Sequence, residues 1–223
     1  MDFELTKTQK EIQKAVREFA KGEFDKDLAL ELEQKHEFPK KIWEKAGDLG
    51  LIGVHFPEEY SGQGLGCLED ILVIEELCRA DSTIGSAVAL SSFASELILH
   101  FGSQELKERW LPKVTEAKML SAGAFTEPDH GSDITFMDTE AVKDGDEWVI
   151  NGTKIFITNG GLAGFYSVLC QTDPEVKPSY RGQSLILVEA DRPGLSTADV
   201  GQKMGIRMMA TAEVNFKDVR VPL

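Results

Sequence analysis

The sequence contains few cysteines, and none of them is spaced as a covalent or metal site would require. Its three cysteines, Cys67, Cys78 and Cys170, are far apart and form no Cys-x-x-Cys pair. We therefore expect neither a disulfide framework nor a zinc site, and a reducing, cytoplasmic compartment fits this usage. The four histidines are equally scattered, so we expect structural or surface roles for them and predict no metal site.

Long apolar runs and an excess of positive charge are also missing. We expect no membrane span, because no apolar stretch approaches the necessary length, and no signal peptide, because the N-terminus leads straight into a charged helix. The 24 basic residues are outnumbered by 38 acidic ones, which gives a net charge of −14. Such a surface repels phosphate backbones and anionic lipids, so no nucleic-acid partner is expected, and a phosphate-bearing ligand would need local hydrogen-bond donors.

The first half of the chain has the periodicity of helices. Thr8 and Glu11 form a capping-box pattern ahead of apolar residues at helical spacing. Pro39 is a good first-turn residue for a second helix. Five helical segments are predicted in this half. The first begins near Thr8, the second begins at Pro39, and the third includes residues 71–77. The last two cover residues 82–100 and 104–114.

The second half changes to short runs of β-forming residues separated by turns. Asp144-Gly145 and Asn151-Gly152 are dipeptides typical of tight hairpin turns. Short strands without long helices between them favour an antiparallel barrel or sandwich. We therefore predict an α+β, multi-domain chain, with an all-α domain over residues 1–117 and an antiparallel β-barrel domain over residues 118–223.

A glycine cluster at Gly62, Gly64 and Gly66 could suggest a dinucleotide-binding loop. The third glycine of the Gly-x-Gly-x-x-Gly pattern would fall on Cys67, and no βαβ unit surrounds the cluster. A structural loop is the better interpretation. A dinucleotide cofactor would therefore have to bind without a Rossmann fold.

Two further stretches could face a ligand, but pattern alone does not decide this. GAFTEPDHGSD, residues 123–133, could cradle an anion with backbone amides or could be an ordinary Pro/Gly turn. INGTKIFITNGG, residues 150–161, could be a plain barrel strand. Its alternation predicts that Lys154, Phe156 and Thr158 share one face, where an aromatic ring and a hydroxyl could meet a planar heterocycle.

Both stretches resemble the signatures of the acyl-CoA dehydrogenase family. The first is similar to its TEPxxGSD string, and the second to a signature that usually has Trp where this chain has Phe156. Four more segments agree in order and spacing over nearly the whole chain: GLIGVHFPEEYSGQGLG, FGSQELKERWLPKV, KMGIR and NFKDVRVP. The chain departs from many members at Met208 and Met209, where they carry small residues.

The resemblance implies a helical domain, a middle β-barrel and a C-terminal four-helix bundle, with FAD between the last two. Phe125 and Thr126 would contact the isoalloxazine ring. Phe156 would pack on that ring, and Thr158 would hydrogen-bond near flavin N5, where such donors stabilise the reduced flavin. Phe in place of Trp keeps the aromatic face and loses the indole N–H.

The resemblance assigns a different role to the end of the first signature. Gly131 and Ser132 would approach the FAD pyrophosphate, and Ser132 would also lie near the pantetheine arm of an acyl-CoA thioester. Glu127 is interpreted as structural. The family's base, a Glu, belongs to the C-terminal bundle, which we expect to lie beyond Leu223, so no catalytic residue is assigned and the chain alone is expected to be inactive.

The activity implied is α,β-dehydrogenation of an acyl-CoA thioester in fatty acid metabolism, with electrons passed to an electron-transfer flavoprotein. The full-length form is expected to be a homotetramer assembled through the C-terminal bundle. Three alternatives remain: an acyl-CoA oxidase that uses oxygen, an enoyl-CoA reductase, and a non-catalytic binding module on the same fold.

Overall fold

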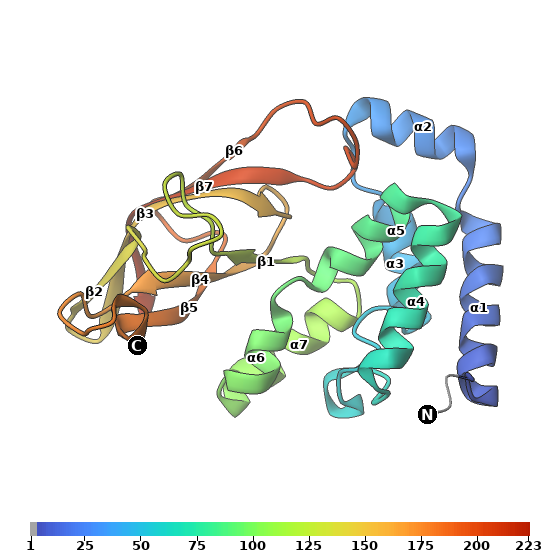
Figure 1. Cartoon of the computed structure of the whole chain (residues 1–223), viewed down its shortest axis with the longest axis horizontal. Coiled ribbons are helices and arrows are strands. Elements are labelled where there is room, and N and C mark those ends of the chain that lie inside the picture. Colours follow the sequence, from blue (N-terminus) through green and yellow to red (C-terminus); the bar gives the residue numbers. More distant parts are fainter. Residues whose placement is uncertain (1–3) are drawn as a thin grey trace. The chain divides into compact units, whose positions relative to one another are not determined.

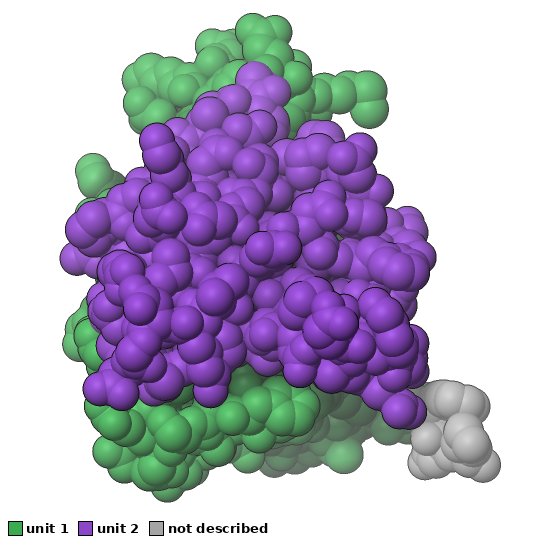
Figure 2. Space-filling model, turned by 90° about the vertical axis from the view of Figure 1, so that its left-hand side faces the viewer, with its two compact units in different colours: residues 1–92, 96–119, 202–209 green, residues 93–95, 120–201, 210–223 purple. Residues whose placement is uncertain are grey.

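The computed structural model of the chain describes residues 4–223 and contains helices followed by strands (Figure 1). The chain divides into two compact units, which Figure 2 colours separately. The helical unit holds the chain up to Ser92 together with Glu96–Met119 and Gln202–Met209. The β unit holds Phe93–Ser95, Leu120–Gly201 and Ala210–Leu223. A loop that lies between two strands in sequence, Gln202–Met209, therefore belongs to the helical unit.

The helical part of the chain consists of α-helices with amphipathic faces and two short 3-10 turns. In order they are α1 (Lys7–Glu23), α2 (Lys26–Lys35), α3 (Lys40–Asp48), η1 (Glu58–Tyr60), α4 (Cys67–Ala80), α5 (Ser82–Ala89), η2 (Leu90–Ser92), α6 (Ser95–Phe101) and α7 (Gln104–Thr115). As predicted, α3 starts directly after Pro39 and buries Ile42, Trp43 and Ala46. Helix α2 was not predicted, because its apolar residues make only a weak periodic pattern.

The first helix begins two residues earlier than the sequence suggested. Its N-cap is Thr6, whose hydroxyl accepts the Gln9 N–H at 3.2 Å while Gln9 Oε1 accepts the Thr6 N–H at 2.9 Å. The predicted cap at Thr8 is wrong, because Thr8 already lies inside α1. Two overlapping Thr-x-x-polar patterns compete here, and the one with Gln at its third position forms the capping box.

The predicted helix over residues 82–100 is interrupted. It divides into α5, η2 and α6, and Ala94 has a left-handed φ of +67°, which an α-helix cannot contain. The 20-residue stretch Ser82–Phe101 is nevertheless long and apolar enough for a membrane-spanning helix by length and composition alone. Half of it is buried inside the protein, and core helices of globular proteins pass the same test, so this is weak evidence for a membrane span.

The β unit is built on one curled, mixed sheet of seven strands. They are β1 (Ser121–Ala124), β2 (Glu140–Asp144), β3 (Glu147–Thr158), β4 (Phe165–Gln171), β5 (Gln183–Glu189), β6 (Leu195–Asp199) and β7 (Thr211–Pro222), with the 3-10 turn η3 (Ser179–Gly182) before β5. The strand order is β1-β4-β2-β3-β7-β6, and β5 pairs with β4 off this path. The predicted fold class, a helical domain followed by a β domain of barrel type, is confirmed, with parallel β1–β4 pairing among otherwise largely antiparallel strands.

One of the two predicted hairpin turns forms. Strands β2 and β3 are joined through Gly145, which has a φ of +63°. The second prediction is wrong: Asn151 and Gly152 lie within β3, at a register shift against β7. Gly152 has a φ of +151°, and a Cβ there would lie 2.6 Å from Thr139 Cα, so this glycine forms a β-bulge and permits close backbone approach.

Candidate functional site

The two signature stretches lie side by side in the β unit. The first forms the end of β1 and the loop over residues 125–139, and the second forms the latter half of β3. The backbone N–H of Ile155 donates to Thr126 O at 2.9 Å, which joins the loop directly to the strand. The segments carrying Phe125 and Phe156 are therefore neighbours in space, as a shared ligand site requires.

Strand β3 contains a second bulge at the residues of interest. The register against β7 shifts between Lys154 and Ile157, and Phe156 has a φ of +55°. Lys154 is fully buried, Phe156 is 65% exposed and Thr158 is half-buried. The prediction that these three side chains share a face is therefore wrong, because the extra residue in the bulge resets the alternation of the strand.

The exposed Phe156 ring is suited to packing on a planar ligand. An aromatic face buries a large apolar area when it stacks on a planar ligand, and Phe156 offers such a face at the bulge. The half-buried Thr158 lies two residues along the same strand. The bulge thus presents an aromatic ring at the point where the resemblance places the flavin.

Three predicted ligand-facing hydroxyls have unused hydrogen-bonding capacity. Among residues 4–223, no protein hydrogen bond is found for the hydroxyls of Thr126, Ser132 and Thr158, of which Ser132 is exposed and the two threonines are half-buried. Gly131 and Ser132 are exposed, and a Cβ at Gly131 would meet no atom within 4 Å. Hydroxyl donors and an exposed glycine backbone are groups of the kind that the ring edge and pyrophosphate of a flavin dinucleotide need.

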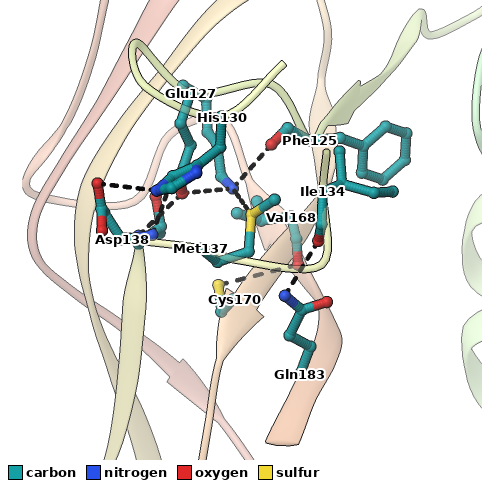
Figure 3. Close-up of polar contacts among 11 residues, drawn as sticks. Phe125, Glu127, His130, Ile134, Met137, Asp138, Val168, Cys170 and Gln183 are labelled. Carbon is teal, nitrogen blue, oxygen red and sulfur yellow. Dashed lines mark hydrogen bonds and ion pairs between the residues drawn. The ribbon is translucent and has the colours of Figure 1, made fainter. Parts of the chain in front are cut away.

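Glu127 and Lys154 form a fully buried ion pair at the base of the loop. Lys154 Nζ lies 2.8 Å from Glu127 Oε1, and the two side chains are 0% and 1% exposed. The backbone N–H groups of Asp138 and Thr139 donate to the same carboxylate at 2.6 and 2.8 Å. In Figure 3 the Phe125 carbonyl is directed at the hydrogen-bond network around Glu127, and the Phe125 ring is turned away from it.

The surroundings shift the pKa of both members of this pair. Burial alone would raise the pKa of Glu127, but the hydrogen bonds from Lys154 and the loop outweigh burial, so its pKa lies below the ordinary value. Burial lowers the pKa of Lys154, and the Glu127 carboxylate opposes that shift. Glu127 is therefore a structural, ionised group without access to a substrate, in agreement with the interpretation from sequence.

A cluster beside this pair has the ligand types of a metal site without its chemistry. Glu127, His130 and Asp138 place ligand atoms within 4.8 Å of one another. The Glu127 carboxylate already accepts hydrogen bonds from Lys154 and from two backbone amides, and the lysine ammonium would repel a cation. The nearby Cys170 is not a nucleophile either, because burial raises the pKa of its thiol to about 12.

The sequence did not reveal the role of Lys154. Alternation placed it on one face with Phe156 and Thr158, and its partner lies 27 residues away along the chain. A buried lysine is rare unless it is paired, and no local sequence pattern predicts a partner so far along the chain. Lys154 lies between the two register shifts of β3 and is fully buried, which alternation along an unbroken strand does not predict.

Comparison with known proteins identifies the family of the chain. The family models for the acyl-CoA dehydrogenase N-terminal domain and middle domain match residues 6–118 and 122–219. The chain is 38% identical to acryloyl-CoA reductase (NADH) of Anaerotignum propionicum and 38% identical to short-chain specific acyl-CoA dehydrogenase of Clostridium acetobutylicum. Each alignment covers 100% of this chain and only 56% and 58%, respectively, of the relative.

A solved structure carries the cofactor that the sequence predicts. Glutaryl-CoA dehydrogenase from Mycobacterium smegmatis in complex with FADH2 is 32% identical, with a TM-score of 0.85 over 98% of this chain and 54% of that one. FADH2 is the reduced form of FAD, so the prediction of FAD is confirmed at the level of the family. The two domain models cover nearly the whole chain, and the chain belongs to the acyl-CoA dehydrogenase family.

Proposed function

We propose that this chain forms the flavin-facing part of an enzyme that dehydrogenates acyl-CoA thioesters between the α and β carbons. The observation that carries this proposal is the exposed Phe156 ring, presented by a bulge beside the Thr126 main chain. FAD, when bound, supplies the acceptor for the hydride that leaves the β carbon.

Each predicted site residue has a role that its own chemistry supports. Phe156 packs on the flavin ring and excludes water from it. Thr126 and Thr158 donate hydrogen bonds to the polar edge of the ring, where donors favour the reduced cofactor. Ser132 binds the pyrophosphate and the pantetheine arm, and the absence of a side chain at Gly131 leaves room for these groups.

The base that removes the α-proton is proposed to lie outside these residues. The one acidic side chain in the first signature that is buried at the site, Glu127, is held by Lys154 and by backbone amides. A carboxylate so constrained cannot reach a substrate carbon. A C-terminal helical bundle, as the resemblance implies, is the proposed source of the base and of a homotetrameric assembly.

The electron acceptor distinguishes two candidate functions. We propose an electron-transfer flavoprotein as the acceptor, in a cytoplasmic enzyme of fatty acid metabolism. The second candidate is an enoyl-CoA reductase, which is favoured by the 38% identity to an acryloyl-CoA reductase that uses NADH. Both candidates use the same flavin site and differ in the direction of hydride transfer.

The test uses the whole natural polypeptide that carries this chain. The purified protein should be yellow, and saturated acyl-CoA added without oxygen should bleach the visible flavin band while the enoyl-CoA product forms. Peroxide formed under air would indicate an oxidase, and faster turnover of enoyl-CoA with NADH would indicate the reductase. A colourless protein that binds no added FAD would contradict the proposal and favour a non-catalytic binding module.

A further inference from the structure

The buried pair connects three parts of the loop to one point on β3. Lys154 Nζ donates to Phe125 O at 3.1 Å and to Met137 Sδ at 3.1 Å in addition to Glu127. These three acceptors match the three protons of an ammonium group. The loop leaves β1 at residue 125 and reaches β2 at residue 140, so the lysine ties its entry and its exit together.

The carboxylate completes the same network from the other side. Glu127 accepts from Lys154 and from the N–H groups of Asp138 and Thr139, so both of its oxygens are engaged. Its own backbone N–H donates to His130 O at 2.9 Å and closes a turn. The exposed part of the loop, residues 128–136, is thereby held at both of its ends.

The network also fixes the main chain that is proposed to face the flavin. Lys154 binds the carbonyl of Phe125, and the following residue of the strand, Ile155, binds the carbonyl of Thr126. Phe156 comes next, at the bulge. One anchored stretch of β3 therefore sets the positions of the loop backbone and of the aromatic ring together.

We infer that Lys154 and Glu127 are a positioning pair for FAD, which hold Phe125–Thr126 and Phe156 in the geometry that the flavin ring requires. The inference rests on the proposed function of these residues. Neither Lys154 nor Glu127 needs to touch the cofactor, since both side chains are buried beneath the loop. The pair acts through the hydrogen bonds that order the surrounding backbone.

A contribution to stability alone does not explain such an arrangement. Desolvation of two charges offsets much of their attraction, so apolar groups of similar shape often replace a buried pair without loss of stability. Directional hydrogen bonds, in contrast, are lost in such a replacement. The double variant K154M/E127Q removes both charges and the ammonium, and leaves no unpaired buried charge.

The test compares this double variant with R17M/E76Q in the whole natural polypeptide. Arg17 and Glu76 form a bidentate pair in the helical unit, with side chains 53% and 2% exposed, so this variant controls for the loss of a partly buried ion pair outside the β unit. Hydrogen exchange is measured at the amides of residues 138, 139 and 155. FAD affinity and the reduction potential of the bound flavin are measured on the same samples.

We expect K154M/E127Q to exchange these amides about tenfold faster and to bind FAD about tenfold more weakly, the scale of one or two lost hydrogen bonds. The flavin potential should shift as well. R17M/E76Q should keep wild-type values for all three. Unchanged FAD affinity and potential in K154M/E127Q would overturn the inference, even if exchange became faster, because the pair would then be merely structural.

Wild-type measurements separate this inference from the proposed function. If the wild type binds no FAD, the proposed function fails and the inference fails with it; if the wild type binds FAD and the double variant binds it equally well, only the inference fails. If the double variant does not fold, amide hydrogen exchange in the wild-type protein tests the inference instead. The amides of residues 138, 139 and 155 should be protected and become slower with FAD, and exchange as fast as at residues 132–134 would overturn the inference.

Discussion

At the scale of single residues, the proposed flavin site depends most on Phe156. Its ring is 65% exposed on a strand whose neighbouring residues Lys154 and Ile157 are buried. Because an aromatic contact with the flavin is worth about 1 kcal/mol or more, F156A should weaken FAD binding about tenfold, whereas F156W should retain it. The measurement is a titration of the apoprotein with FAD, followed by flavin fluorescence.

A control for this prediction comes from the same unit. Val142 on β2 is 60% exposed and has no predicted ligand contact, so V142A should leave the FAD affinity unchanged. Equal losses in F156A and V142A would mean that the effect is general, and wild-type affinity in F156A would remove Phe156 from the site.

Another residue, His55, gives the helical unit a dependence on pH. Its Nδ1 lies 3.1 Å from Asp70 Oδ2, and its Nε2 lies 3.8 Å from Glu96 Oε1. The contact with Asp70 raises the pKa of His55, and burial opposes this shift in part. A raised pKa in the folded state adds stability below the unfolded value of about 6.5, and this stability is lost as pH rises through the folded value.

The substitution H55Q should therefore cost more stability at about pH 5.5 than at about pH 8.5. Urea unfolding at the two values measures this difference. A loss from H55Q that is constant or grows toward high pH would contradict the ion-pair explanation.

At the scale of elements, the two bulges of β3 decide where the site residues point. Gly152 has a φ of +151°, and a Cβ there would overlap the Thr139 backbone at 2.6 Å. We expect G152A to destabilise the protein by about 2–4 kcal/mol, because both the dihedral and the contact forbid a side chain. Urea unfolding measures this cost, and a loosened β2–β3 pairing should accompany it.

The matched control for this element is the turn glycine Gly145. It also has a left-handed φ, +63°, but a Cβ there would meet no atom within 4 Å. G145A should therefore cost about 1 kcal/mol, which is the dihedral contribution alone. Similar losses for G152A and G145A would show that close contact with Thr139 does not matter.

The same elements show which structural features could be predicted from the sequence. The turn at Gly145 and helix α3 were predictable, because a Gly turn and a Pro followed by spaced apolar residues act locally. The Asn151-Gly152 dipeptide carries the same local signal as a turn, and only pairing with β2 and β7 makes it a bulge. The inward direction of Lys154 depends on that bulge and on a distant carboxylate, so periodicity could not reveal it.

At the scale of the whole molecule, motif order was more informative than any single pattern. The site stretch over residues 123–133 is by itself an ordinary turn, and the stretch over residues 150–161 an ordinary strand. Six segments in register identified the family, which the two domain models confirm over residues 6–118 and 122–219. The order and spacing of motifs identify the family even where the predicted strand faces and helix caps are wrong, because they depend on the sequence alone.

The division into units follows contacts rather than sequence order, and the loop Gln202–Met209 shows this. It lies between β6 and β7 but belongs to the helical unit, where the backbone N–H of Arg207 donates to the Glu33 carboxylate at 3.0 and 3.2 Å. Met208 is 1% exposed, whereas Met204 is fully exposed. The departure from the family pattern at position 208 therefore fills buried space.

This arrangement predicts that a loop between two strands contributes to stability through the helical unit. M208A should destabilise the protein by about 2–5 kcal/mol, as expected for a large side chain removed from a buried site. M204A, in the same loop, should change stability by less than about 0.5 kcal/mol. Urea unfolding gives both values, and hydrogen exchange in α2 should become faster in M208A alone. If M208A leaves α2 exchange at the wild-type rate, Met208 does not stabilise the helical unit through α2.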